Sequence, residues 1–224
     1  SGIRLRDAAF LNSGVVALWR RQSGGYSVPS LMESPMPTSG GEFGFATALS
    51  GAGELVVAER RFTVGGARSS GAIHHYVDQG GAWVLTGSVA NPGVSNNSFG
   101  HSLDYDGDLM VVGAPHANPL PGVQGAAYVF QRNGSGWTLL ASLDAGPSGN
   151  LEQFGSSVAV RGRRVLVGAP RHTDGGALRG SGYFFEEVGG VWTLVMQVIP
   201  DASTGDQYCG VSVAMDGATA VIGA

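Results

Sequence analysis

The segment FGHSLDYDGDLMVVGAP (residues 99–115) recurs in related form four times in this chain, and this repetition limits the fold more than any other feature. The other copies begin near residues 43, 154 and 209 and align with it without gaps. The leading glycines, Gly44, Gly100, Gly155 and Gly210, follow one another at intervals of 56, 55 and 55 residues. The chain is therefore expected to build the same supersecondary unit four times.

Each unit is predicted to contain four short antiparallel strands. In the second unit, one strand is expected from Ser102 to Tyr105 and another from Leu109 to Val112. The intervening Asp106-Gly107 suits a two-residue hairpin turn that needs positive φ. A second segment recurs in step with the first and predicts a third strand from Ala126 to Phe130 and a fourth that begins at Trp137.

Four-stranded units of this length are typical of β-propeller blades, which protect strand edges by arranging sheets around an axis. The sequence therefore predicts an all-β fold: one β-propeller domain over residues 1–224, with four blades of about 55 residues. Residues 1–42 are expected to complete the last blade, supplying its third and fourth strands beside the C-terminal first and second strands. This pairing closes the ring and predicts a monomer. The alternative is a piece of a larger ring.

Composition excludes several classes of partner. A net charge of −4 and a pI near 5.7 argue against nucleic acid, because a phosphate backbone requires a concentrated cationic surface. No run of about 18 apolar residues is present, so no membrane span and no signal peptide are predicted. The lone Cys209 excludes an intramolecular disulfide.

The ends of the repeated segment resemble the FG-GAP repeat of integrin α-subunit propellers, in the short-loop form of secreted bacterial proteins. Phe99-Gly100 with Gly113-Ala114-Pro115 carries the resemblance, and so does Phe154-Gly155 with Gly168-Ala169-Pro170. Two units depart from the pattern. Glu59 stands where proline is expected, and Cys209 replaces the phenylalanine; both are interpreted as tolerated variants. The resemblance implies an extracellular or cell-surface protein with a role in adhesion.

The resemblance also raises calcium binding by Asp104, Asp106 and Asp108, because integrin repeats often carry an Asp-rich calcium loop between their first two strands. Calcium needs six or more oxygen ligands from a loop that wraps around it, whereas a tight turn is predicted here. The equivalent positions in the third unit include Ala159 and Arg161. The three aspartates are therefore interpreted as solvated turn carboxylates. No metal or other cofactor is expected, with calcium as the alternative.

No catalytic residues are predicted. Gly100-His101-Ser102 places a serine beside a base, but the neighbouring residue becomes Ser156 and Val211 in later units, which argues against a catalytic role. The serine is interpreted as a small residue on a crowded inner strand. His116, His172 and the pair His74-His75 suggest zinc only weakly, since no ligand spacing repeats. A hydrolase or lyase is the least favoured function.

Aromatic residues share one position after the second turn of each unit. Trp83, Trp137, Trp192 and Tyr26 recur in phase with the glycines, which favours packing between blades. Stacking on sugar rings is the alternative interpretation.

The connections after the second and fourth strands are expected on one face, because the strands alternate in direction. Variable loops on such a face are the predicted binding surface. Arginines there are expected to pair with carboxylates of a protein partner, while the other residues shape the rim. The predicted binding residues are Arg60, Arg61, His116, Arg171, His172 and Asp174. The sequence thus predicts a non-catalytic binding or adhesion scaffold for a protein partner, with a lectin-like carbohydrate-binding propeller as the alternative.

Overall fold

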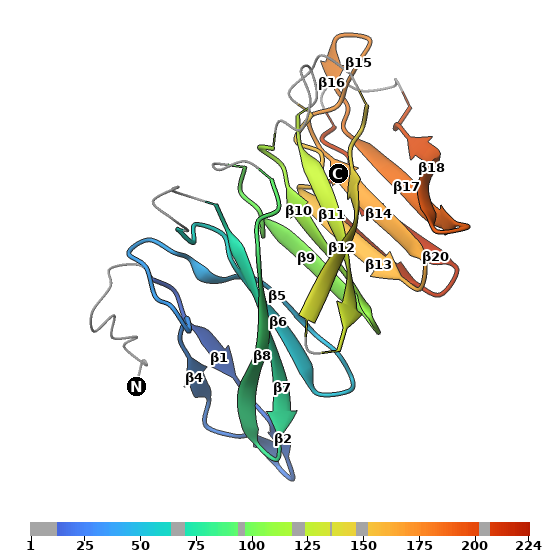
Figure 1. The fold of residues 1–224 in the computed structure, drawn as a ribbon. Coiled ribbons are helices and arrows are strands. Elements are labelled where there is room, and N and C mark those ends of the chain that lie inside the picture. Colours follow the sequence, from blue (N-terminus) through green and yellow to red (C-terminus); the bar gives the residue numbers. More distant parts are fainter. Residues whose placement is uncertain are drawn as a thin grey trace.

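A computed structural model describes residues 13–63, 70–93, 97–117, 124–134, 136–146, 152–201 and 207–224. These residues form strands and no helix, and three sheets contain four antiparallel strands each (Figure 1). The first blade consists of β5 (Phe43–Leu49), β6 (Glu54–Glu59), β7 (Ala72–Gln79) and β8 (Ala82–Ala90). The second blade consists of β9 (Ser102–Asp106), β10 (Leu109–Ala114), β11 (Ala126–Asn133) and β12 (Gly136–Leu143). The third blade consists of β13 (Ser157–Arg161), β14 (Arg164–Ala169), β17 (Ser181–Val188) and β18 (Val191–Val198).

The predicted all-β fold and its four-stranded unit are confirmed. In the second blade Asp106 pairs with Leu109 across a two-residue turn, and Gly107 has a φ of +64°. Gly162 and Gly217 occupy the same turn in later units with φ values of +55° and +53°. Glycine adopts this conformation without the steric cost that a Cβ imposes.

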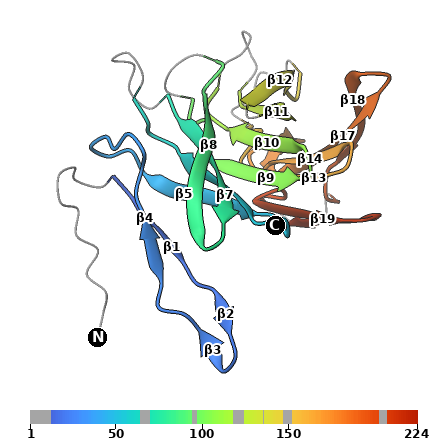
Figure 2. The same ribbon diagram turned by 60° about the horizontal axis from the view of Figure 1, so that its bottom comes forward.

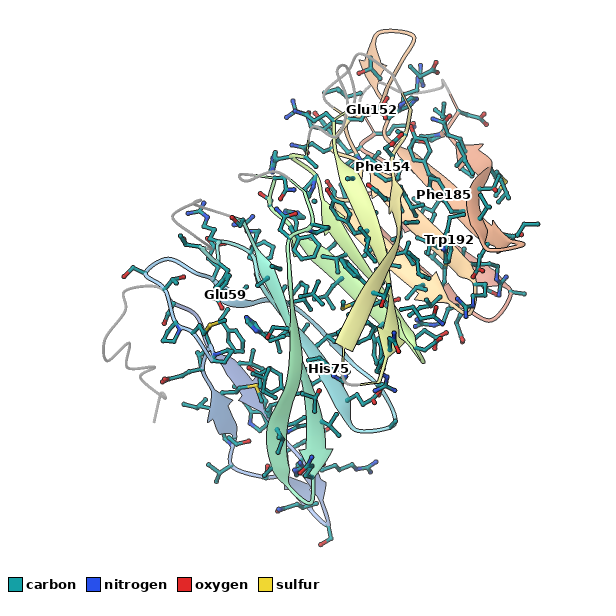
Figure 3. All side chains as sticks on the ribbon, in the orientation of Figure 1. Glu59, His75, Glu152, Phe154, Phe185 and Trp192 are labelled. Atoms are coloured by element: carbon teal, nitrogen blue, oxygen red, sulfur yellow. The ribbon has the colours of Figure 1, made fainter. Side chains whose placement is uncertain are left out.

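The first strands of the units lie side by side at the centre of the arrangement, as Figure 2 shows for β5, β9 and β13. The fourth strands β8 and β12 lie on the outside. Apolar residues fill the space between blades. Phe154, Phe185 and Trp192 lie together between the second and third blades (Figure 3), where Phe154 is fully buried. Trp83 and Trp137 also pack against interblade cores, which confirms the predicted role of the tryptophans, whereas Tyr26 is exposed.

Close backbone contacts between successive blades explain the recurring glycines and serines. Gly125 approaches Phe154 so closely that a Cβ would overlap the backbone of Phe154. The Ser102 hydroxyl donates a hydrogen bond to the carbonyl of Gly155 at 2.9 Å. Ser157 makes the same bond to Gly210 at 2.8 Å. The recurring serine therefore links neighbouring blades, consistent with its interpretation as a structural residue.

The predicted ring closure is not confirmed. β1 (Val16–Leu18) pairs with β4 (Ser30–Met32), and this hairpin continues through β2 (Arg21–Gln22) and β3 (Gly25–Tyr26). β19 (Ser212–Asp216) pairs only with β20 (Thr219–Gly223) among the described strands. The two hairpins lie apart in Figures 1 and 2.

The contacts of each terminal hairpin explain this difference. Gly14 bridges to Phe43, as Gly125 does to Phe154, which places the N-terminal hairpin before the first blade. Gly180 bridges to Cys209 in the same way, which places β19 and β20 after the third blade. Each hairpin therefore occupies a regular position in the row of blades, with the three complete blades between them. Residues 1–12, which were expected to contribute to the last blade, lie outside the described residues.

The loop between β14 and β17 forms a small additional hairpin, which the sequence did not predict. Its strands are β15 (Thr173–Asp174) and β16 (Ala177–Leu178).

Gly125→Ala should destabilise the protein strongly, because the new Cβ would meet the Phe154 backbone at a φ of +96°. We expect a loss of about 3 kcal/mol or more in the free energy of unfolding, measured by urea denaturation. Gly134→Ala is the matched control: its φ is also positive, at +62°, but no atom lies within 4 Å of the new Cβ. It should cost about 1 kcal/mol. Equal losses in the two variants would contradict the interblade explanation.

Candidate functional site on the loop face

The connections after the second and fourth strands lie on one face, as predicted, and we call this surface the loop face. The amide of His116 donates to the carbonyl of Asn97 at 3.2 Å. The amide of Arg171 donates to the carbonyl of Glu152 at 3.1 Å. In both cases the loop after the second strand of a blade is hydrogen-bonded to the loop that enters the same blade.

The residue before each repeated phenylalanine or cysteine adopts a left-handed conformation. Glu42, Ser98, Gln153 and Tyr208 have φ values of +60°, +58°, +55° and +54°. Positive φ is uncommon outside glycine, and here it occurs at one position of all four units. The carbonyl of each residue accepts a hydrogen bond from the amide three positions later, for example from Phe45 to Glu42 at 3.1 Å. The backbone thus holds these four side chains in equivalent positions on the loop face.

Arg60 is largely committed to contacts within the protein. Its guanidinium pairs with Glu42 at 2.6 Å and lies 3.8 Å from the ring centroid of Phe45. A further nitrogen lies 3.4 Å from Nδ1 of His101. The Arg60 side chain is only 18% exposed, whereas that of Arg61, which pairs with the same Glu42 at 3.2 Å, is 56% exposed. Of these two predicted binding residues, Arg61 is the more accessible and Arg60 orders the rim.

His101 belongs to this cluster, although the predicted set of binding residues does not include it. Its ring lies 5.4 Å from that of Phe45. Burial, the Arg60 guanidinium and His116 lower the pKa of His101 below its ordinary value of 6.5. The imidazole is therefore neutral at pH 7 and offers a hydrogen-bonding group without a charge.

The equivalent positions in the second and third blades are more open. His116 is exposed, and its Nδ1 lies 3.0 Å from the Ser98 hydroxyl. Arg171 is exposed and makes no ion pair with the residues that the structure describes. Because Arg61, His116 and Arg171 occupy the same position on successive blades, the predicted set forms a row along the loop face and not a single cluster.

His172 is held by a buried polar cluster beneath the loop. Its Nδ1 lies 2.9 Å from Oε1 of Glu152, a carboxylate that is almost completely buried. The Tyr183 hydroxyl donates to the other oxygen of Glu152 at 3.1 Å, and burial and this carboxylate raise the pKa of Tyr183. The amide of Gln197 lies 3.3 Å from Nε2 of His172. His172 thus anchors the loop, and its side chain is only 14% exposed.

Asp174 lies on the β15–β16 hairpin and is more than half exposed. Arg179 is buried and fixes this hairpin, because its Nε contacts the Asp174 carboxylate at 3.4 Å and its carbonyl at 3.2 Å. Asp174 therefore lies on a loop that Arg179 holds in place, three residues after Arg171 in the sequence.

Glu59 and His74 were not predicted as site residues, yet both are fully buried and in contact. His74 Nε2 lies 3.2 Å from Glu59 Oε2. Glu59 and Glu152 lie toward the same end of their blades (Figure 3). The sequence predicted Glu59 at the proline position as a tolerated variant, and this is wrong. Because the β5–β6 turn is one residue longer than the β9–β10 turn, Glu59 lies at the position of Ala114 and Ala169, and Arg60 lies at that of the proline.

The three candidate calcium ligands lie at the hairpin turns, away from the loop face, and contact protein groups. Asp104 accepts hydrogen bonds from the amide of Val160 at 2.9 Å and from Arg161 at 3.0 Å. Asp106 accepts one from the amide of Gly162 at 2.7 Å, and Asp108 accepts one from Gln131 at 2.6 Å. Asp104 and Asp106 therefore join the second blade to the third.

Metal ligation has no support in the described residues, which contain no group of three or more His, Cys, Asp or Glu residues able to hold an ion. The two adjacent histidines have separate partners, since His74 contacts Glu59 and His75 contacts Thr86. The expectation of a protein without metal stays a prediction.

The fold and the loop face define a repeat protein of the β-propeller type, built from four-stranded blades with a variable loop surface. Comparison with protein families matches the FG-GAP repeat at residues 89–130 and 137–185. These residues therefore contain FG-GAP repeats. Such repeats are commonly found in binding and adhesion proteins, and the family is generally non-enzymatic and typically extracellular. A search of curated proteins finds no match. Across the described residues, no helix is long and apolar enough to span a membrane.

Arg60→Gln should raise the pKa of His101, because it removes a positive charge that disfavours the imidazolium. Burial persists in this variant, so the pKa should stay below 6.5. Titration followed by NMR of the His101 ring would measure the change. Arg61→Gln is the control, because Arg61 also pairs with Glu42 but does not contribute to the pKa of His101. An equal shift in both variants would contradict a direct effect of Arg60.

Proposed function

We propose that this protein is a binding and adhesion scaffold that recognises a protein partner through the loop face, outside the cell or at its surface. The observation that carries the proposal is Arg171, an exposed arginine with no ion-pair partner among the described residues, on a loop anchored by a buried cluster. His116 occupies the equivalent position on the second blade and is also exposed. The loop face acts by contact and needs no catalytic group.

Rigid support beneath the loops favours this function. Ordering flexible side chains and loops on binding costs free energy, so a surface that is already ordered binds more tightly. Here Glu152, His172 and Tyr183 fix the base of the Arg171 loop, and Arg179 fixes the β15–β16 hairpin. The loop face therefore presents its exposed side chains from a preorganised base.

Carboxylates are the partner groups that fit this surface best. Arginine presents a planar fork of donors that matches a carboxylate with two parallel hydrogen bonds. Arg171 and Arg61 are the exposed arginines of the predicted set. We infer that the partner surface carries aspartate or glutamate residues that face them.

A carbohydrate partner is less well supported. Three of the four aromatic residues that were considered as sugar platforms, Trp83, Trp137 and Trp192, pack against interblade cores. Only Tyr26 of this set is largely exposed. The equivalent weak sites that a lectin of repeated units would use are therefore occupied by the core.

Replacing both exposed arginines, Arg61→Ala with Arg171→Ala, should weaken partner binding about tenfold or more, because two charge-assisted contacts are lost. The labelled protein would be screened on an array of extracellular protein domains and on a glycan array, and the affinity of the hits measured by interferometry. Arg163→Ala is the matched control, since Arg163 is an exposed arginine at the hairpin end of the third blade.

The control should change affinity less than twofold, and a chelator should have no effect. Saturable hits confined to glycans would overturn the proposal in favour of a lectin. Protein hits that bind the double variant as tightly as the wild type would place recognition on another surface.

A further inference from the structure

The first blade departs from the others at linked positions of the buried polar cluster. Its residues there are Gly41, Glu59 and His74, whereas the second blade has Asn97, Ala114 and Tyr128 and the third has Glu152, Ala169 and Tyr183 at the equivalent strand and loop positions. The changes compensate in space, because the Glu59 carboxylate fills the volume that a side chain at position 41 would occupy. Compared with the third blade, a buried carboxylate is kept but comes from β6, and the strand residue that contacts it is His74 where the third blade has Tyr183.

The histidine connects the buried carboxylate to a serine on the outermost strand. His74 Nε2 lies 3.2 Å from Glu59 Oε2, and His74 Nδ1 lies 2.9 Å from the Ser88 hydroxyl oxygen. A neutral imidazole that donates its Nε2 hydrogen to the carboxylate keeps a lone pair on Nδ1 for the Ser88 hydroxyl. The three side chains therefore form a hydrogen-bonded chain in the order serine, histidine, glutamate. In this order the serine takes the place of a nucleophile, the histidine that of its base, and the glutamate that of the acid that orients the base.

The base in this chain is rigidly placed. The His74 ring is fully buried, and the rings of Phe43 and Phe62 lie 5.8 and 6.0 Å from it. The Ser34 hydroxyl donates a second hydrogen bond to Glu59 Oε2 at 2.6 Å. His74 and Glu59 are thus shielded from solvent and held in a fixed orientation, which strengthens the electrostatic interaction between them.

Ser88 itself is accessible. It lies opposite His74 in the β7–β8 register and is exposed. Together with His74 it lines a mostly apolar pocket of about 400 Å³, whose other walls include Met36, Phe62 and Val89. A pocket of this size holds a small ligand.

Backbone donors lie beside the hydroxyl. The amide of Asn91 bonds inward to the carbonyl of Gly71 at 3.3 Å. Because inward and outward amides alternate along an antiparallel strand, the amides of Ser88 and Ala90 point away from β7. β8 is the edge strand of its sheet, so these amides face outward next to the nucleophile. Donors in such a position can stabilise an oxyanion.

We propose that Ser88 is a nucleophile for acyl transfer from small esters with an apolar acyl group. Its oxygen attacks the ester carbonyl carbon, the bond to the alcohol oxygen breaks, and the serine proton passes through His74 Nδ1 to the departing alkoxide. Water then attacks the acyl-serine, the carboxylic acid leaves, and the proton returns to Ser88. His74 is the general base and Glu59 its positioning residue. This activity belongs to the first blade and is independent of binding at the loop face.

A fluorophosphonate probe tests the nucleophile directly, because the serine oxygen displaces fluoride at phosphorus. We expect covalent labelling of Ser88, located by peptide mass spectrometry, at least 100-fold faster than that of Ser142. Ser142 is the internal control: it lies at the same strand position in the second blade and is exposed, but it faces Tyr128. Ser88→Ala should abolish the fast labelling, whereas Ser142→Ala should leave it unchanged.

His74→Tyr places in the first blade the residue that the other two blades have, so this variant should fold and yet lose the fast labelling.

Glu59→Gln should slow turnover of p-nitrophenyl butyrate about tenfold or more in kcat with little change in KM. Thermal unfolding would verify that each variant is folded. Labelling of Ser88 no faster than that of Ser142, or equal labelling of wild type and folded His74→Tyr, would overturn the proposal.

Discussion

The close approach of backbone between neighbouring blades is the constraint on which the rest of this structure depends. Gly113 of the second blade faces Gly155 of the third, and a Cβ on Gly113 would overlap the Gly155 carbonyl. The Ser102 hydroxyl bonds to that same carbonyl. Only glycine allows two strands to meet at this distance, and only a short hydroxyl satisfies the carbonyl there. The FG and GAP ends of the repeat are therefore two halves of one interblade contact.

The first blade shows what happens when this contact changes. Ala58 replaces the GAP glycine and Ala46 replaces the serine, and the β5–β6 pairing has an irregular register between Phe43 and Thr47. A larger side chain at the contact prevents the usual close approach, and a methyl group cannot donate the hydrogen bond. The first blade thus differs from the other two in its contact with the next blade, and its buried polar cluster differs as well.

The sequence predicted the strands and turns well because their signals are local. Glycine at a required positive φ and alternation within short strands both repeat at fixed intervals, so four copies reinforce one another. Ring closure depends on where the two terminal hairpins lie relative to each other, and similarity between repeats carries no information on that. The role of Glu59 was missed for a related reason. A departure from the repeat indicates that a position is unusual, but burial and the contact with His74 follow only from the three-dimensional arrangement.

Equivalent positions in a repeat protein have equal backbone geometry but can take opposite roles. Arg61 and Arg171 occupy equivalent positions, since their amides bond to the carbonyls of Gly41 and Glu152, and both were predicted to bind a partner. The left-handed residue in the first blade is Glu42, which pairs with Arg61, whereas the third blade has Gln153, which leaves Arg171 without a carboxylate at that position. One substitution at a neighbouring position therefore decides whether the exposed arginine has an ion-pair partner among the described residues. The same principle separates Ser88 from Ser142, because the residue opposite each serine decides whether its hydroxyl faces a base. The specialised chemistry of this scaffold is set by pairs of residues, and the first blade has accumulated more of these changes than its neighbours.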